Sequence, residues 1–250
     1  MPRNLEEYNG AYKGRTCFIV APGPSVYEQD LAPLEDHVTI AVNGGICAYP
    51  KSDFFVSDDW DVANWTYFSR DLRNLDTNVL LYDAKLSNAV SWFGDRSILF
   101  RHRKGHHVTD EYIHDDPAKH IWEARTTAGT AIHIAHIMGC SEIVLIGMDC
   151  CRTKNKRYFW EFPMKQEHTC LKTVPRRTDK RPADRYRKTK QGATTTDTDL
   201  MQILAYWKKV GEVMNSHCRI LNASPNSIID VFPKINLSEY IGTVQVEESG

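Results

Sequence analysis

Residues 126–149 read TTAGTAIHIAHIMGCSEIVLIGMD, and this stretch decides the fold class. Thr130–Met138 is a run of small and apolar residues closed by Gly139, as is typical of a helix and its C-terminal stop. Glu142–Ile146 follows with an unbroken apolar run, the pattern of a strand covered on both faces. A helix followed directly by such a strand predicts a parallel sheet with helices packed on it.

More segments of strand length have the same apolar character, and turn-forming residues separate them. They are Cys17–Ala21, Val38–Val42, Asp53–Val56, Val79–Tyr82, Ser97–Phe100 and Cys218–Asn222. A second helix is predicted over Asp197–Asn215, where the apolar residues share one stripe. Because the chain has no internal repeat and no low-complexity linker, we expect one α/β domain over residues 1–250. It should be Rossmann-like, with a mainly parallel sheet flanked by helices.

Composition excludes several classes of protein. The chain has 250 residues, 42% hydrophobic and 25% charged, which is typical of a globular domain with a full core. No apolar run approaches the roughly 18 residues of a membrane span, and residues 1–10 lack the apolar core of a signal peptide. Seven cysteines without a CxxC pair predict reduced thiols. We therefore expect a cytoplasmic protein with no membrane span, whose oligomeric state the sequence leaves open.

The formal net charge of −1 conceals a basic segment at residues 151–192. This segment holds 14 Lys and Arg against 4 Asp and Glu, so its charge is 14 − 4 = +10. The rest of the chain then carries −1 − 10 = −11. We interpret the segment as an insert near the active site that meets an anion, with a solvated surface loop as the alternative.

Polar or turn-forming residues follow several predicted strands where each strand ends. The first strand ends at Pro22-Gly23-Pro24-Ser25, where two proline rings leave the backbone little freedom. Later strands are followed by Asn43, by Asp58 and Asp59, and by Asp149. Ligands of open parallel sheets bind at the carboxyl ends of the strands, so we expect these side chains to converge on one site. All are also common turn residues, so structural roles are the alternative.

The start of the helix in the opening stretch has a composition suited to anions. It reads Arg125-Thr126-Thr127-Ala128-Gly129-Thr130. Small hydroxylated residues and a glycine at a helix N-terminus leave backbone N–H groups and the positive end of the helix dipole accessible. A nucleotide phosphate would fit there, and ordinary helix capping is the alternative.

These segments occur in an order that resembles a known superfamily. The order is IVAPGPSV, IAVN, the 126–149 stretch, TDTDLMQIL and ILNASPNS, which together span most of the chain. It resembles the bacterial lipooligosaccharide sialyltransferases, the motility-associated flagellin glycosyltransferases and the archaeal hydroxymethylpterin diphosphokinase-like proteins. The resemblance implies a single Rossmann-like domain that binds a nucleotide-activated donor, typically a CMP-sugar in the sialyltransferases.

The resemblance also implies which residues bind the donor, a CMP- or UDP-linked sugar. They are Gly23, Pro24, Ser25, Asn43, Thr127, Ala128, Gly129 and Tyr158. Gly23, Pro24 and Ser25 match the turn that lies against the donor in the family. Thr127, Ala128 and Gly129 match the helix start that holds the nucleotide there. Asp149 matches the aspartate that closes a Gly-x-Asp strand end, and Tyr158 falls where the sialyltransferases carry phosphate-binding tyrosines.

The chain departs from the family's pattern at two places. Pro22 stands where the family has an asparagine that contacts the donor phosphate. Residues 192–197 contain no histidine, although the sialyltransferases place their catalytic histidine just before the Thr-Asp that opens the late helix. A sialyltransferase that uses this base is therefore not expected, so either the base comes from elsewhere or the donor differs.

Transfer from a nucleotide to an acceptor hydroxyl needs a base for the acceptor proton and positive groups for the leaving phosphate. The catalytic residues we predict are Asp58, Asp59 and Asp149, with Asp197 and His168 as further candidates for the base. Asp58 or Asp59 is favoured as base or metal ligand, and an extended chain turns only one of the two toward the site. The histidine-rich run 101–120 lacks zinc-ligand spacing, so no metal site is predicted. Mg²⁺ or Mn²⁺ is compatible with the sequence and not required by it.

We predict a glycosyltransferase that moves a sugar from a nucleotide-sugar to an anionic acceptor such as DNA, RNA or a phosphorylated glycan. The residues expected to contact acceptor phosphates are Arg176, Arg177, Lys180 and Arg181. Tyr158, Phe159 and Trp160 would add stacking contacts. Two alternatives stay open, a Mg-ATP-dependent diphosphokinase acting on a pterin-like alcohol and a nucleotide-binding module that has lost catalysis.

Overall fold

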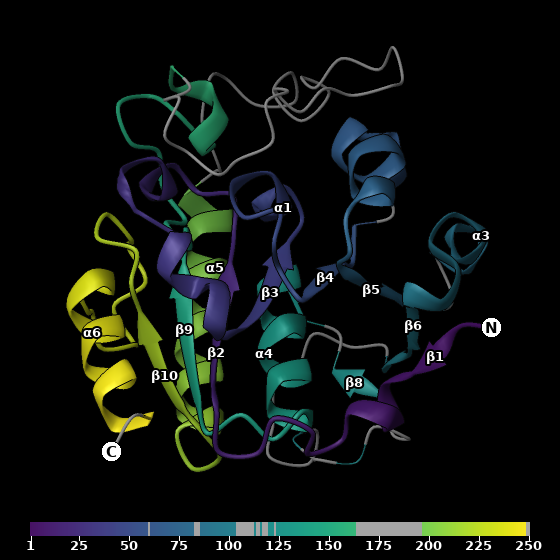
Figure 1. Cartoon of the computed structure of the whole chain (residues 1–250). Helices are drawn as coiled ribbons and strands as arrows, with labels where there is room; N and C mark the ends of the chain where they lie inside the picture. The colour runs from purple at the N-terminus through teal and green to yellow at the C-terminus, as the bar shows by residue number, and fades with distance from the viewer. Residues whose placement is uncertain are drawn as a thin grey trace.

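The computed structural model describes residues 1–59, 61–82, 86–103, 113, 116, 120–122, 124–163 and 197–248 (Figure 1). Within them an eight-stranded sheet runs in the order β1-β6-β5-β4-β3-β2-β9-β10, and every neighbouring pair is parallel. The strands are β1 (Arg3–Asn4), β2 (Thr16–Val20), β3 (Val38–Val42), β4 (Phe54–Ser57), β5 (Asn78–Tyr82), β6 (Ser97–Phe100), β9 (Glu142–Ile146) and β10 (Arg219–Asn222). A separate parallel pair joins β7 (His102–Arg103) to β8 (Ile121–Trp122).

Helices and short helical turns connect the strands. The α-helices are α1 (Gly45–Ala48), α3 (Val90–Phe93), α4 (Thr127–Ile137), α5 (Asp197–Met214) and α6 (Leu237–Glu248). The short turns are η1 (Leu5–Tyr8), η2 (Pro24–Glu28), η3 (Ala32–Asp36), η4 (Val62–Asn64), η5 (Tyr67–Asp71), η6 (Leu72–Asn74), η7 (Ser87–Ala89), η8 (Gly94–Arg96) and η10 (Phe159–Glu161).

The sheet has a hydrophobic core on each face. On one face α4 and α5 pack against side chains such as Ile19 and Ile40. On the other face α1, α6 and most of the short turns pack against the residues next to these in each strand, such as Phe18 and Ala41. Alternate residues of one strand thus belong to opposite cores, which explains why the central strands are apolar throughout.

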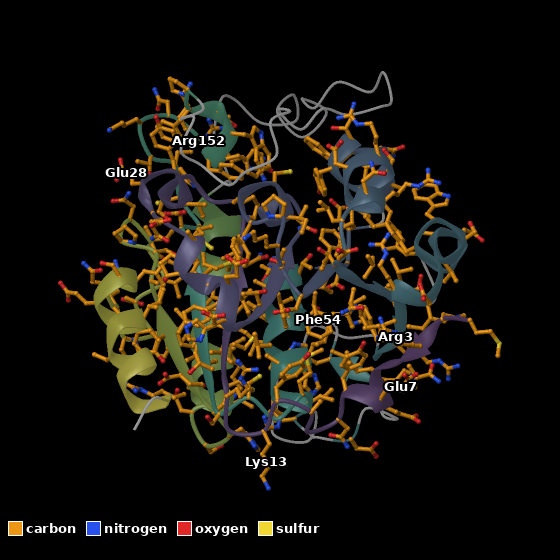
Figure 2. The ribbon with its side chains drawn as sticks, viewed as in Figure 1. Arg3, Glu7, Lys13, Glu28, Phe54 and Arg152 are labelled. Carbon is orange, nitrogen blue, oxygen red and sulfur yellow. The ribbon has the colours of Figure 1, made fainter. Side chains whose placement is uncertain are left out.

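The core on the α4 face extends to the N-terminal segment. Phe54 of β4 is fully buried, and the rings of Tyr8 and Tyr12 meet it edge-on with centroids 5.3 and 5.9 Å away. Figure 2 shows Phe54 inside the molecule, with the charged side chains of Glu7 and Lys13 at the periphery. Among the described residues no helix has the length and apolar character to cross a membrane.

The predicted fold class, a mainly parallel sheet flanked by helices, is confirmed. Three predicted strands, such as Glu142–Ile146, have the observed bounds, and the other four are shifted by one residue at one or both ends. The main difference is α4, which begins at Thr127 rather than Thr130. Thr126 adopts an extended conformation and its side chain accepts a hydrogen bond from the N–H of Gly129, so it caps the helix one turn earlier. The sequence analysis did not predict β1, the β7–β8 pair or α6.

Strand order places a switch point at β2, which has β3 on one side and β9 on the other. The carboxyl ends of these strands carry the corner at Pro22–Ser25, the turn at Asn43 and the Gly147–Asp149 segment. In open parallel sheets this is where ligands bind.

That residues 1–250 form one domain stays a prediction. The basic segment 151–192 is described only as far as Pro163.

Candidate functional site

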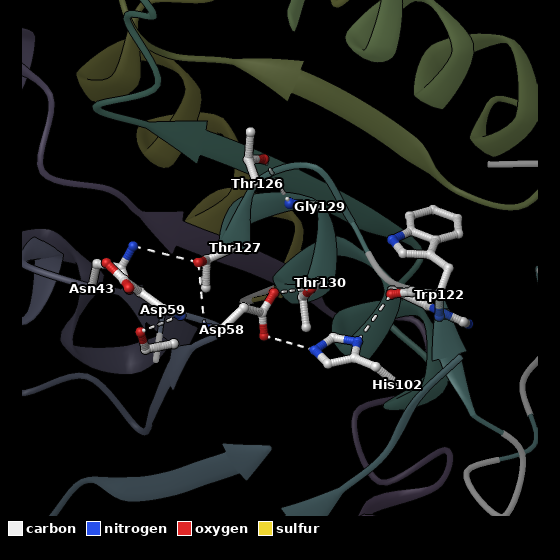
Figure 3. A network of polar contacts seen from close by, with 11 residues as sticks. Asn43, Asp58, Asp59, His102, Trp122, Thr126, Thr127, Gly129 and Thr130 are labelled. Carbon is white, nitrogen blue, oxygen red and sulfur yellow. Dashed lines mark hydrogen bonds and ion pairs between the residues drawn. The ribbon is translucent and has the colours of Figure 1, made fainter. Parts of the chain in front are cut away.

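The Asp58 carboxylate lies just beyond β4 and is held on both oxygens. Its Oδ1 is 2.9 Å from Nε2 of His102, and the hydroxyl of Thr130 in the first turn of α4 donates to its Oδ2. The side chain of Asp58 is 17% exposed, whereas that of His102 is 2% exposed. Figure 3 shows the carboxylate between the two donors. Asp58 is therefore fixed in orientation and still open to solvent on part of its surface.

Hydrogen-bonding partners determine where protons sit in this pair. Nδ1 of His102 is 3.2 Å from the carbonyl oxygen of Trp122 in β8, which can only accept, so Nδ1 carries a proton. Nε2 on the other side of the ring contacts Oδ1 of Asp58, so the imidazole joins β8 to the Asp58 carboxylate. The rings of Tyr82 and Phe100 pack edge-on against His102, with centroids 4.5 and 5.1 Å away, and fix the imidazole plane.

Thr127, the first residue of α4, links Asp58 to the end of β3. Its hydroxyl oxygen is 3.4 Å from both the backbone nitrogen of Asp58 and the side-chain nitrogen of Asn43. Asn43 has a φ of 50°, a left-handed conformation that Asn tolerates. Its Oδ1 is buried and has no hydrogen-bond partner among the described residues. The start of α4 thus brings Thr127 together with two of the residues that follow predicted strands, Asn43 and Asp58.

The two adjacent aspartates have different roles. Oδ1 of Asp59 accepts the backbone N–H of Asp61 at 2.9 Å, and the backbone N–H of Asp59 itself donates to the Ser57 hydroxyl. Asp59 therefore caps the turn after β4, while Asp58 is the one that faces α4. The expectation that an extended chain turns only one of them toward the site agrees with this geometry.

The corner after β2 is tied to the end of β9. The backbone N–H and the hydroxyl of Ser25 donate to the Oδ2 of Asp149 at 3.1 and 2.9 Å. Ser25 and Asp149 are both 1% exposed. A Cβ at Gly23 would lie within 3.0 Å of this same Oδ2 and of the Gly147 carbonyl oxygen. In this structure Ser25 binds Asp149 and the backbone N–H of Gly23 donates to the Gly147 carbonyl, and contacts of Gly23, Ser25 and Asp149 with a donor or acceptor stay predictions.

The environment of Asp149 predicts a pH effect on stability. Burial raises the pKa of Asp149, and the hydrogen bonds from Ser25 oppose that rise. Because the folded-state pKa lies above the unfolded value of about 3.9, the folded protein holds this proton more tightly. The contribution to stability is therefore full below about pH 3.9 and is lost as the pH rises through the folded-state pKa.

Asp149→Asn is expected to remove this pH dependence, because the amide oxygen can accept both Ser25 donors without carrying a charge. Urea denaturation of both proteins between pH 4 and 7 should show a shallower fall in the variant and no loss of stability at pH 7. A variant that folds normally but has no turnover would instead assign Asp149 the catalytic role predicted from the sequence.

Gly129 faces the late helix rather than an open site. A Cβ there would lie within 3.0 Å of the Tyr206 hydroxyl oxygen and 2.8 Å from the Cβ of Ala124. Gly129→Val would therefore displace Tyr206 of α5, so we expect this substitution to disturb the packing of α4 on α5. Ala128 is buried in the first turn of α4 next to it. Contacts of both residues with a nucleotide stay predictions.

An aromatic group covers the carboxyl ends of β2 and β3. Tyr158 stacks on Trp160 with ring centroids 4.5 Å apart, and the guanidinium of Arg157 lies 5.2 Å from the Tyr158 ring centre. A Cβ at Gly44 would lie 2.5 Å from the Trp160 ring, and the backbone N–H of Phe159 donates to the Pro22 carbonyl. Trp160 thus rests on the bare backbone of Gly44, beside Asn43. Figure 1 shows this turn (η10, green) above the strand ends.

Several predicted residues lie outside the described residues. They are His168, Arg176, Arg177, Lys180 and Arg181. The backbone of Asp197 begins α5, and its side chain is not described. Within the described residues there is no group of three or more His, Cys, Asp and Glu side chains arranged to hold a metal ion.

The sequence analysis missed His102, Thr130 and Tyr206. His102 belongs to the histidine-rich run interpreted as a polar loop, and no spacing in that run relates it to Asp58. Thr130 was placed at the predicted helix start, but no pattern in the sequence pairs it with Asp58. The apolar stripe of Asp197–Asn215 marks the helix that contains Tyr206, but it does not show which helix start that tyrosine meets.

Comparisons with known proteins agree with this fold. The solved structure described as "Structure of MAf glycosyltransferase from Magnetospirillum magneticum AMB-1" matches 98% of this chain, with a TM-score of 0.53 and 11% sequence identity. The chain corresponds to 40% of the length of that protein. No curated protein sequence matches. A family model described as "6-hydroxymethylpterin diphosphokinase MptE-like" matches residues 1–155. Since these residues are more than half of the chain, the protein belongs to the MptE-like family.

Proposed function

We propose that this protein is a nucleotide-dependent transferase that moves a sugar from a nucleotide-sugar to an acceptor hydroxyl. The observation that carries the proposal is the position of Asp58. Its carboxylate accepts a hydrogen bond from Thr130 in the first turn of α4, so a candidate base lies beside a helix N-terminus suited to a phosphate. The fold is shared with a protein described as a glycosyltransferase, which supports this choice of transferred group.

In the proposed reaction each group has a stated task. The first turn of α4 holds the donor phosphate, and its helix dipole stabilises the charge that develops as the bond from the anomeric carbon to the phosphate oxygen breaks. The acceptor oxygen forms the new bond to that carbon, and Asp58 takes the acceptor proton. The nucleotide leaves with the bonding electrons. His102 and Thr130 keep the carboxylate aimed at the acceptor.

The unpartnered Oδ1 of Asn43 supports a polar ligand at this place. A buried acceptor without a donor is costly, and such atoms in native proteins often mark a place that a water or ligand fills. Asn43 contacts Thr127, so a ligand bound at the start of α4 could offer a hydroxyl or N–H to this oxygen. A nucleoside has both kinds of donor next to its phosphate.

The family match favours a second candidate, transfer of diphosphate from ATP to a pterin-like alcohol. The same base and helix start would serve, since that reaction also deprotonates a hydroxyl next to a nucleotide phosphate. Mg²⁺ would be held chiefly by the phosphates, because it needs only one or two protein carboxylates in such sites. Asp58 contacts the start of α4 through Thr127 and Thr130, so its carboxylate would meet this limited demand.

The acceptor is proposed to be anionic on the charge of residues 151–192. Arg152, Lys156 and Arg157 belong to the described part of this segment, and Arg157 lies over the Tyr158 ring. Binding of short DNA and RNA that weakens with salt would support the proposal. Binding that persists when Arg176, Arg177, Lys180 and Arg181 are changed to Ala would contradict it.

A thermal-shift panel separates the candidate functions. CMP, UDP, GDP and ATP, each with and without Mg²⁺, should be added to the whole chain. A bound nucleotide at 100 times its Kd stabilises the fold by about 2.7 kcal/mol, which raises Tm by several degrees. CMP or UDP as the stabilising ligand supports glycosyl transfer, and ATP with Mg²⁺ alone supports the diphosphokinase. Absence of any shift would overturn both and leave a protein without nucleotide binding.

A further inference from the structure

One buried tyrosine hydroxyl has no acceptor in the part of the chain that the structure describes. Tyr206 of α5 is 7% exposed, and its hydroxyl oxygen has no hydrogen-bond partner among the described residues. A buried hydroxyl without a partner loses the free energy of its bonds to water, and few native groups are left so. The ring itself is well placed, since it packs edge-on against Trp207 with centroids 5.2 Å apart. Packing therefore explains the position of the ring, but it does not explain why the ring carries a hydroxyl there.

The hydroxyl lies over the first turn of α4. It occupies the space that a Cβ of Gly129 would need, and Gly129 is the third residue of that helix. Burial raises the pKa of Tyr206, and the charge of Asp58 raises it further. The hydroxyl is therefore close enough to Asp58 for the carboxylate to affect its ionisation. The phenol therefore keeps its proton and is available as a hydrogen-bond donor. Asp58 does not accept it in this structure, where the carboxylate oxygens contact His102 and Thr130 and the Tyr206 hydroxyl has no partner among the described residues.

An acceptor for this proton must enter from outside the described residues, next to the positive end of α4. Anionic oxygens are stabilised at such a helix end. Residues 192–197, at the start of the late helix, contain no histidine. Tyr206, further along α5, is a polar side chain that this helix places next to the start of α4.

We propose that Tyr206 is a ligand-binding residue whose hydroxyl donates to a phosphate oxygen of the nucleotide held at the start of α4. This inference rests on the proposed function and adds a residue on α5 to the site. The hydroxyl is buried in this structure, so binding includes a shift of the ring that brings it to the phosphate.

The test compares Tyr206→Phe with the wild type and with Tyr240→Phe as a matched control. Tyr240 lies on α6, and its hydroxyl is 3.5 Å from the hydroxyl of Thr16, on the opposite face of the sheet from α5. Melting curves without ligand come first, followed by titrations with pyrophosphate and with the nucleotide that gives the largest shift. Tyr206→Phe should melt at the wild-type temperature or above it, because the lost hydroxyl has no partner among the described residues.

With ligand, Tyr206→Phe should bind about 10- to 100-fold more weakly, the range for a hydrogen bond to a charged group. Tyr240→Phe should bind as the wild type does. Wild-type affinity in Tyr206→Phe, or a lower melting temperature without ligand, would overturn this inference and leave the proposed function standing. A wild type that binds neither pyrophosphate nor any nucleotide would overturn both.

Discussion

Asp58→Asn is expected to lower turnover by about 10²- to 10⁴-fold while nucleotide binding is retained. Asn has the shape of Asp, and its amide oxygen can still accept from Thr130, so the local fold should survive. It cannot take the proton of an acceptor hydroxyl. The loss should therefore appear in kcat rather than in the affinity for the nucleotide, which thermal shift measures independently.

Asp59→Asn is the comparison that assigns the base between the two adjacent aspartates. Asp59 accepts the backbone N–H of Asp61, which an Asn oxygen can also accept, so this variant should keep the turn after β4 and most of its turnover. His102→Gln should give an intermediate loss, because Asp58 keeps its charge but loses one of the two contacts that aim it. If Asp59→Asn abolished turnover and Asp58→Asn did not, Asp58 would be a structural residue.

Much of the sheet could be predicted because its signals are local. Val38–Val42 and Glu142–Ile146 are apolar runs ended by turn residues, and burial on both faces leaves such runs no other stable arrangement. The edge strand β1 has two residues, Arg3 and Asn4, and neither is apolar. Its pairing with β6 depends on the rest of the fold, and no pattern in the first residues of the chain predicts this strand.

The candidate site was only partly predictable, because some of its residues follow local signals and others meet only through the tertiary fold. Asn43 and Asp58 were found because each follows a strand, and Thr127 because it opens a helix. His102 reaches Asp58 across 44 positions, through a two-residue strand whose partner β8 is also two residues long. Sequence patterns identify strand ends and helix starts, whereas the choice between a ligand-facing and an inward-facing side chain depends on packing. Ser25 shows this, since its hydroxyl points to Asp149.

Gly23→Ala is expected to destabilise the protein by about 3 kcal/mol, at the upper end of the usual cost of overpacking. Gly23 has φ −63° and ψ 160°, a conformation that alanine adopts readily, so the effect is purely steric. The new methyl group would lie within 3.0 Å of the Gly147 carbonyl oxygen, to which the Gly23 N–H donates, and of Asp149. Neither atom can retreat without breaking a bond that joins β2 to β9.

Gly242→Ala is the matched control for this change. It lies in α6 with nothing within 4 Å of the added Cβ, so alanine should stabilise the helix by roughly 0.5–1 kcal/mol. Urea denaturation of both variants measures the two opposite effects, and nucleotide titration of Gly23→Ala shows which role the corner has. A variant with wild-type stability and no nucleotide binding would show that Pro22–Ser25 faces the donor, as the family resemblance implies. A large loss of stability would show that the two prolines and Gly23 make a rigid corner because β2 and β9 must be joined there.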